Sequence, residues 1–277
     1  MRPVVIVPPV GSPRPILVEV PHAGVGIPEA VRGELALDDE GVKRDADLYV
    51  DRLYERAPEL GATLVFTEIS RFVVDLNRAA DDVDSLSVAG HPSPRPEAPR
   101  GVIWRIATDG KPALRGPLSL ASYRARLAAY HAPYHLALDE AVASLQARFG
   151  RVIVLSGHSM PSVGKATHAD PGKLRAEVVP GDRRGQSCAQ AVMLAAMAHF
   201  EGAGLSVAPN DPYLGGETTR RLGRPLEGIH ALQVELNRAL YMDERTFAIK
   251  DRGFDRLRGL CEGLVERLGE LAYSLPP

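Results

Sequence analysis

Short apolar runs separated by helical patterns restrict the fold of this chain more than any other feature of its sequence. Runs of this length, rich in valine, isoleucine and leucine, are typical of strands that are buried on both faces of a sheet. We predict five such strands, at Ile16–Val20, Thr63–Ile69, Phe72–Leu76, Val152–Leu155 and Ile229–Leu236.

Amphipathic helical patterns lie between these runs. The periodicity predicts helices over Asp45–Leu60, Ser122–Phe149, Gln186–Phe200 and Phe254–Ala272, the second of them bent where Pro133 removes a backbone donor. Strands that alternate with helices indicate a mainly parallel or mixed sheet covered on both faces. We therefore predict one three-layer α/β domain that spans residues 1–277.

A polar excursion interrupts this alternation at about residues 79–118. The segment is rich in proline and glycine, contains HPSPRPEAP, and is too long for a plain connection between a strand and a helix. We expect it to lie over the functional site.

Charge and composition favour a small-molecule partner. The formal net charge is −2, so no basic field indicates binding to nucleic acid or to an anionic membrane. Cys188 and Cys261 lie far apart and in no metal-binding spacing, which is typical of free thiols in a reducing compartment. No signal-peptide pattern opens the chain and no apolar run approaches about 18 residues, so we expect a cytoplasmic protein without a membrane span.

Polar side chains follow the predicted strands at the edge where parallel sheets bind ligands. His22 comes directly after the first strand, and His158 follows Val152–Leu155. A hydrolytic zinc site uses three nitrogen or carboxylate ligands and an open position for water. We predict Asp47 as the third ligand, with Asp45 as a helix N-cap or as an acceptor that orients a histidine. The reverse assignment, and a purely helix-capping role for both aspartates, stay open.

Glu235 lies on an otherwise apolar strand, where a carboxylate is costly unless it is paired or chemically used. It is our candidate general base, and an ion pair with Arg238 is the structural alternative. Guanidinium groups bind carboxylates in a bidentate manner, so Arg71, Arg78 and Arg220 are candidates for holding an acidic substrate.

A serine mechanism is the rival hypothesis, because GHSMP is one residue away from the G-x-S-x-G turn of α/β-hydrolases. Ser159, Asp182 and His230 even occur in the chain order of that family. Pro161 makes a poor start for the helix that must follow the serine, so we predict Ser159 to be a hydrogen-bonding neighbour of His158. A protein that binds an acidic amino acid without turnover is the alternative from another class.

An ordered set of motifs gives the chain a family resemblance. VPHAG, RDADLYVDRLY, SRFVVDLNR, GHSMPS, GDRRGQSC, PYLGGETTR and GRPLEGIHALQVELNRALYMDE occur in this order between His22 and Glu244. The chain resembles the N-formylglutamate amidohydrolases. The resemblance implies an α/β fold related to zinc carboxypeptidases and amidases, and hydrolysis of N-formyl-L-glutamate to formate and L-glutamate in histidine degradation. Relatives with this pattern that act on other N-acyl amino acids remain an alternative.

The resemblance also implies roles for particular residues. It supports one divalent metal ion, zinc in first place, and makes Asn77 and Arg78 similar to the pair that holds a substrate carboxylate in related zinc amidases. It implies the metal ligands His22, Asp47 (or Asp45) and His158, the catalytic Glu235, and Arg220 as a second anion-binding residue. One departure concerns Val25, which stands where carboxypeptidases have a glutamate ligand three residues after the first histidine, so the acidic ligand must come from farther along the chain.

Overall fold

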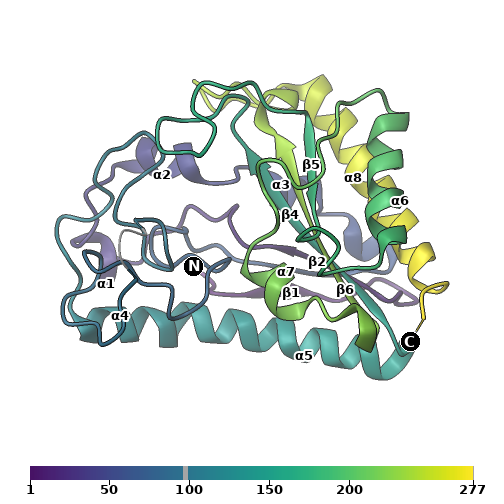
Figure 1. Ribbon diagram of the computed structural model, residues 1–277, viewed down its shortest axis with the longest axis horizontal. Helices are drawn as coiled ribbons and strands as arrows, with labels where there is room; N and C mark the ends of the chain where they lie inside the picture. Colours follow the sequence, from purple (N-terminus) through teal and green to yellow (C-terminus); the bar gives the residue numbers. More distant parts are fainter. Residues whose placement is uncertain (96–98, 277) are drawn as a thin grey trace.

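A six-stranded mixed sheet forms the centre of the molecule (Figure 1). The computed structural model describes residues 1–95 and 99–276; residues 96–98, within the HPSPRPEAP run, and residue 277 lie outside the described part. The strand order is β1-β3-β2-β4-β6-β5; the four central strands are parallel, and β1 and β5 are antiparallel edges. The strands are β1 (Val5–Val7), β2 (Ile16–Val20), β3 (Thr63–Phe66), β4 (Val152–Met160), β5 (Val178–Gly181) and β6 (Ile229–Asn237).

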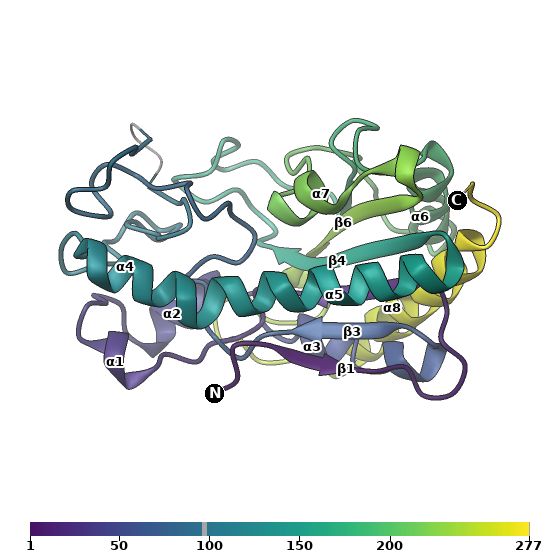
Figure 2. The same cartoon turned by 90° about the horizontal axis from the view of Figure 1, so that it is seen from below.

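Helices cover both faces of this sheet, as predicted. The long helix α5 runs along one face, whereas α3, α6 and α8 lie on the other (Figures 1 and 2). Among the helices in the described part of the chain, none is both long and apolar enough to cross a bilayer. The α-helices are α1 (Glu29–Arg32), α2 (Asp39–Asp45), α3 (Val50–Leu53), α4 (Leu120–Arg126), α5 (Ala132–Phe149), α6 (Gln190–Gly202), α7 (Glu217–Leu222) and α8 (Asp251–Ala272). Short 3-10 helices lie at Ala57–Leu60, Pro225–Glu227 and Arg238–Leu240.

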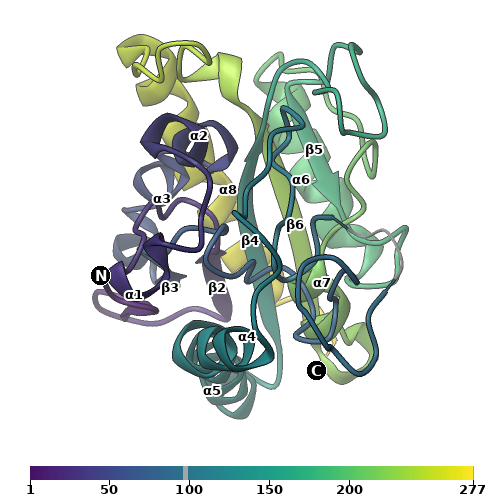
Figure 3. The same ribbon diagram turned by 90° about the vertical axis from the view of Figure 1, so that its left-hand side faces the viewer.

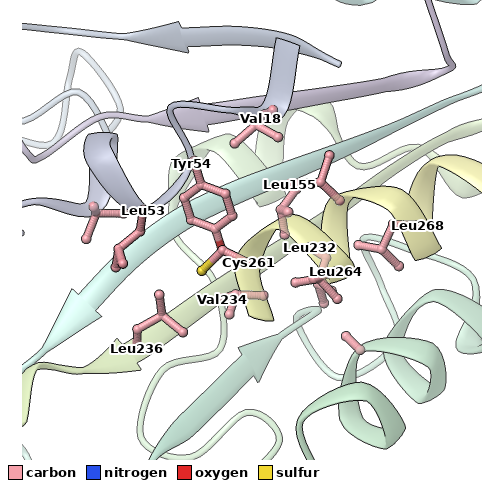
Figure 4. Close-up of a cluster of buried hydrophobic side chains, with 14 of the residues drawn as sticks. Val18, Leu53, Tyr54, Leu155, Leu232, Val234, Leu236, Cys261, Leu264 and Leu268 are labelled. Carbon is pink, nitrogen blue, oxygen red and sulfur yellow. The ribbon is translucent and has the colours of Figure 1, made fainter. Parts of the chain in front are cut away.

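The larger part of the core lies between the sheet and α8. Leu155 and Leu232 of the strands face Leu264 and Leu268 of α8 in this apolar cluster (Figure 4). The ring of Tyr54 packs on the same side of the sheet and is 1% exposed. A second apolar cluster fills the space between the sheet and α5. Each face of the sheet is therefore buried, which explains the almost continuous apolar runs of the central strands.

Two of the predicted elements are wrong. Phe72–Leu76 is not a strand, because it folds into turns in which the backbone N–H of Val73 bonds to Ser70 and that of Asp75 bonds to Val102. Its apolar side chains are buried by loops rather than by sheet pairing. The sequence pattern also missed the short edge strands β1 and β5.

The predicted helix Asp45–Leu60 is broken into separate pieces. Asp45 is the last residue of α2 rather than the N-cap of a helix, and α3 begins only at Val50. Tyr49, between them, has a left-handed backbone with φ 68°, which no helix interior accepts. The break leaves Asp47 in a short connecting segment, where its side chain is free to point at the sheet.

Strands β4 and β6 extend farther than the sequence predicts and carry the polar residues within them. His158 pairs with Glu235 across the two strands, and Ser156 pairs with Gln233. Alternate residues of a strand face the same side. These four side chains consequently form a polar patch on the α5 face of the sheet, at the carboxyl ends of the strands.

The described part of the excursion at 79–118 packs against the core on the α5 side of the sheet. Figure 3 looks onto the carboxyl ends of the strands, with the loops of this segment in front. The described part of the segment has no regular helix or strand, yet it contributes several fully buried side chains to the core on the α5 side. They include Val83, Val88, Val102, Ile103, Ala107 and Leu118.

The helical region before α5 supports the chain around residue 78. A π segment, Leu127–His131, immediately precedes Pro133 and accommodates the missing proline N–H by a wider turn. The ring of His131 lies 2.9 Å from the carbonyl oxygen of Arg78.

His135 lies 4.2 Å from His131, centroid to centroid, and its Nδ1 accepts a hydrogen bond of 3.1 Å from Arg221. Burial, followed by the charges of His131 and Arg221, lowers the pKa of His135 to about 3.

The contact between Gly157 and Tyr54 gives a first prediction. A Cβ at Gly157 would lie 2.6 Å from a ring carbon of the buried Tyr54, so Gly157→Ala should destabilise the protein by about 1–3 kcal/mol. Gly259→Ala in α8 is the matched control, because a Cβ there meets no atom within 4 Å and alanine favours the helix by about 1 kcal/mol. Urea unfolding measures both, and equal effects of the two variants would contradict the packing argument.

The lowered pKa of His135 predicts a pH dependence of stability. Below about pH 6.5 the unfolded chain binds a proton at His135, whereas the folded chain does not bind it until about pH 3. The free energy of unfolding therefore falls as the pH falls through this window, at up to about 1.4 kcal/mol per pH unit for one group. His135→Gln should flatten the slope between pH 6 and 4 measured by urea unfolding. An unchanged slope would show that His135 is protonated in the folded protein.

Candidate metal and substrate site

A cavity of about 360 Å³ opens at the carboxyl ends of the parallel strands. Its floor contains His158 and Glu235 from the two central strands, together with His22 and Asp47 from the segments that follow β2 and α2. Its walls come from the excursion, from residues 159–175 and from the loop before α7. This is the position at which open α/β sheets bind ligands.

Three side chains on the floor direct ligand atoms at one point. The Nδ1 atoms of His22 and His158 are 3.2 Å apart, and Asp47 Oδ2 lies 3.1 Å from His158 Nδ1 and 3.6 Å from His22 Nδ1. All three residues are almost fully buried. They form a group of ligand type that could hold a metal ion.

The separations fit a divalent metal. In a tetrahedral zinc site with bonds of about 2.0–2.1 Å, ligand atoms lie about 3.3–3.4 Å apart, and the three separations bracket this value. Two imidazole nitrogens with their lone pairs toward each other repel unless a cation lies between them. The donor set of two imidazoles and one carboxylate is that of catalytic zinc sites.

Asp75 orients His22 from behind. Its Oδ1 lies 2.8 Å from His22 Nε2, while Arg71 binds its other oxygen at 2.9 Å. Although burial raises the pKa of Asp75, the charges of His22 and Arg71 hold it well below its usual value. The anionic carboxylate thus accepts the Nε2 proton and leaves the Nδ1 lone pair directed at the ligand point. The sequence reasoning missed Asp75, although a carboxylate within the apolar run FVVDL is the same signal that identified Glu235.

Asp47 is kept anionic by its neighbours. Arg238 Nη2 binds its Oδ1 at 3.0 Å, which leaves Oδ2 for the two histidines. Burial alone would raise the pKa of Asp47, but hydrogen bonding with His158 and His22 and the charges of His22 and Arg71 hold it well below the usual value. Arg238 therefore pairs with Asp47, and not with Glu235 as the structural alternative for Glu235 had it.

Glu235 lies beside the ligand group with one oxygen held in place. Gln233 Nε2 donates to its Oε1 at 3.0 Å. Burial raises the pKa of Glu235, and the negative charge of Asp47 adds to this effect, against the opposing charges of His158, Arg71 and His22. A carboxyl group with a raised pKa can accept and release a proton near neutral pH.

Asp45 and Ser159 take positions that differ from our expectations. Asp45 accepts hydrogen bonds from the backbone N–H, at 2.9 Å, and the hydroxyl of Thr108, and so anchors the excursion rather than a histidine. Ser159 Oγ accepts from Arg238 at 3.1 Å. Its side chain points to the opposite face of β4 from His158, so the predicted hydrogen bond to that histidine is replaced by one to Arg238.

A serine triad is excluded by strand register. Ser159 is opposite Leu236 in the ladder, whereas His230 lies six residues earlier on β6. At about 3.3 Å per residue the two side chains are about 20 Å apart. Asp182 is bonded to Asn210, and His230 Nδ1 accepts from the backbone of Ala189.

Only three of the four predicted substrate-binding residues line the cavity. Asn77 lines the cavity and is fixed by Gln233 and by the N-terminus of α7 through Thr218. Arg78 also lines the cavity, and it has no acidic partner within 4.0 Å among the described residues. Arg71 lines the cavity but is engaged by Asp75.

Arg220 is not brought to this cavity. Its guanidinium pairs with Glu217 through two contacts of 2.7 Å, and its side chain is 55% exposed on α7. It lies outside the cavity lining that the described residues form. The turn PYLGGETTR lines the cavity through residues 212–216 instead.

Arg100 and Trp104 of the excursion also line the cavity, and sequence reasoning missed both. The Trp104 ring is flanked by the guanidinium groups of Arg71 at 4.4 Å and Arg100 at 5.7 Å. Burial lowers the pKa of Arg100, and the positive charges of Arg78 and Arg71 lower it further. Arg78 and Arg100 thus form a region of uncompensated positive charge that an anion would stabilise.

Comparison with known proteins assigns the chain to a family. The model of the family described as N-formylglutamate amidohydrolase matches residues 14–242. The chain is 34% identical to N-formylglutamate deformylase of Pseudomonas aeruginosa, over 92% of each chain, and 33% identical to that of Pseudomonas putida, over 83% of this chain and 82% of the relative. The crystal structure of N-formylglutamate amidohydrolase from Ralstonia eutropha JMP134 superposes with a TM-score of 0.91 at 31% identity, covering 99% of both chains. A protein from Agrobacterium tumefaciens shares the fold, with a TM-score of 0.66 at 24% identity over 97% of this chain and 95% of that one. The chain therefore belongs to the N-formylglutamate amidohydrolase family.

Proposed function

We propose that this protein hydrolyses N-formyl-L-glutamate to formate and L-glutamate with the help of one divalent metal ion, zinc in first place. The convergence of His22, Asp47 and His158 beside the buried Glu235 is the observation that carries this proposal. The names of the relatives, N-formylglutamate deformylase, support the substrate. The cytoplasmic location and the absence of nucleic-acid partners stay predictions.

The residues of the cavity floor have different roles in the proposed reaction. A divalent cation held by the three ligand atoms would supply Lewis-acid chemistry, polarising a carbonyl group and lowering the pKa of water. Glu235 accepts a proton from the attacking water and delivers it to the glutamate nitrogen as the bond between the formyl carbon and that nitrogen breaks. Gln233 keeps the carboxylate in position for both transfers.

Arg78 and Arg100, which together we call the cationic wall, position the substrate. N-formylglutamate carries two carboxylates, and Arg78 and Arg100 offer guanidinium groups that are not paired with an acid among the described residues. Guanidinium groups bind carboxylates with two parallel hydrogen bonds. Arg71 contributes indirectly, because it fixes Asp75 and covers the face of Trp104. With both carboxylates at the wall, the small formyl group is directed to the floor.

Metal removal tests the proposed reaction. We expect the purified protein to contain about one metal ion per chain and to release formate from N-formylglutamate. Exhaustive chelation should reduce formate release to background, and added Zn²⁺ should restore it. Elemental analysis and a formate assay over N-formyl, N-formimino and N-acetyl amino acids measure the metal and the substrate together. Full activity in the chelated protein would show that the reaction does not require a metal. If no substrate of the panel releases formate, the alternative of a binding protein without turnover is favoured.

Glu235→Gln is the internal control for this test. The variant keeps the three ligands, so it should retain its metal, while kcat should fall about 10²- to 10⁴-fold with the loss of proton transfer. A variant that loses metal as well would place Glu235 among the ligands instead.

A pair of arginine variants tests the substrate wall. Arg78→Ala removes a cavity guanidinium and should raise KM for N-formylglutamate about 10- to 100-fold, since a hydrogen bond to a charged group contributes about 1.5–3 kcal/mol. Arg220→Ala removes the same charge from the exposed face of α7 and should leave KM nearly unchanged. Steady-state kinetics compare the two. A larger effect at Arg220 would reverse the assignment.

A further inference from the structure

Glu19 is a buried carboxylate that the proposed reaction does not use. It lies near the carboxyl end of β2, is 0% exposed, and has no basic side chain within 4.0 Å among the described residues. Its two oxygens accept hydrogen bonds from neutral hydroxyls instead, Oε1 from Ser156 at 2.6 Å and Oε2 from Tyr134 at 2.7 Å. A carboxylate in the middle of a parallel sheet is costly. This cost calls for a role beyond packing.

Ser156 connects this carboxylate to the metal site. Its hydroxyl has one proton to donate, and the 2.6 Å separation from Glu19 is typical of a short hydrogen bond from a hydroxyl to an anion. Ser156 Oγ is also 3.0 Å from His158 Nε2. Because the proton of the hydroxyl points at Glu19, its oxygen can only accept from that nitrogen. The contact with Ser156 therefore favours a proton on Nε2 of His158.

The position of that proton decides whether His158 can bind a metal. With Nε2 protonated, the lone pair of Nδ1 faces Asp47 Oδ2 and His22 Nδ1. In the other tautomer a proton on Nδ1 would bond to Asp47 and occupy the ligand point. Asn77 favours that other tautomer, because its Nδ2 is 3.3 Å from His158 Nε2 and can donate to it. Ser156 and Asn77 thus compete for the same nitrogen.

We propose that Glu19 and Ser156 are positioning residues, which act as a hydrogen-bond relay that holds His158 in its metal-binding tautomer. The inference rests on the proposed metal-dependent function. It gives the two ligand histidines equivalent support: Asp75 fixes His22 directly, and Glu19 fixes His158 through a hydroxyl. Partners behind metal ligands commonly contribute about 10- to 100-fold to metal affinity.

Two single-atom deletions separate the relay from ordinary packing. Ser156→Ala and Tyr134→Phe each remove one hydroxyl donor from Glu19, but only Ser156 contacts His158. Ser156→Ala should weaken Zn²⁺ binding about 10- to 100-fold, measured by competition with a chelator. Tyr134→Phe should bind Zn²⁺ nearly as tightly as the unchanged protein, although thermal unfolding should show it destabilised too. Equal Zn²⁺ affinity in the two variants would overturn the relay.

The histidine tautomer gives a second measurement that needs no metal. In metal-free protein in alkaline buffer, the ¹⁵N chemical shifts of the His158 ring should report a larger share of the tautomer with its proton on Nε2 in the unchanged protein than in Ser156→Ala, although the anionic Asp47 favours a proton on Nδ1 in both. Glu19→Gln is the isosteric companion if Ser156→Ala fails to fold, and it should change the shifts in the same direction. An equal share of the two tautomers in the unchanged protein and in Ser156→Ala would refute the relay even if Zn²⁺ binds. Protein that binds no Zn²⁺ but whose His158 proton moves toward Nδ1 in Ser156→Ala would refute the proposed function and leave the relay standing.

Discussion

The geometry of the site depends on two imidazole nitrogens that face each other across 3.2 Å, with a carboxylate oxygen beside both. Such a group is stable only with a cation at its centre or with a proton shared among its members. Each of the three candidate ligands comes from a different segment, so the fold has to bring three distant parts of the chain to one point. The parallel register of β2 and β4, and the break between α2 and α3, meet this requirement.

Buried charge has to be compensated around that point, and the compensation is specific. Arg238 engages the outer oxygen of Asp47, and Arg71 engages the outer oxygen of Asp75. Each arginine leaves the inner oxygen of its aspartate to a histidine. Removing one partner of such a buried pair leaves an uncompensated charge, so both arginines support the candidate metal site even though neither is a candidate ligand.

The sequence predicts the layers of the fold and the two histidines, because apolar periodicity and strand ends are local signals. It could not distinguish Asp45 from Asp47, since the choice depends on where α2 ends and on the left-handed backbone of Tyr49. Nor does the sequence show that Arg220 lies outside the cavity, because the orientation of α7 decides which of its side chains face the cavity.

Carboxylates within apolar runs are the exception, since sequence alone indicates them. The rule that singled out Glu235 applies equally to Asp75 in FVVDL and to Glu19 in ILVEV. All three are buried in the structure and lie in or directly behind the site. Applied to every apolar run, the rule would have identified two of the residues that the motif search missed.

Arginine clusters, by contrast, are poor guides to substrate binding until their partners are known. Seven cationic side chains line the cavity, namely Arg44, Arg71, Arg78, Arg100, Lys165, Arg175 and Arg238. Arg71, Arg175 and Arg238 are engaged by buried or half-buried acids, and Arg44 by Asp109. Arg78, Arg100 and Lys165 have no acidic partner within 4.0 Å among the described residues. Arg78 and Arg100 lie close enough for the charge of Arg78 to lower the pKa of Arg100. Two like charges held together in this way repel, and a dicarboxylate between them removes the repulsion as it binds. The same arrangement explains why an acidic substrate would orient in one direction, with its carboxylates at the wall and its neutral formyl group at the acidic floor.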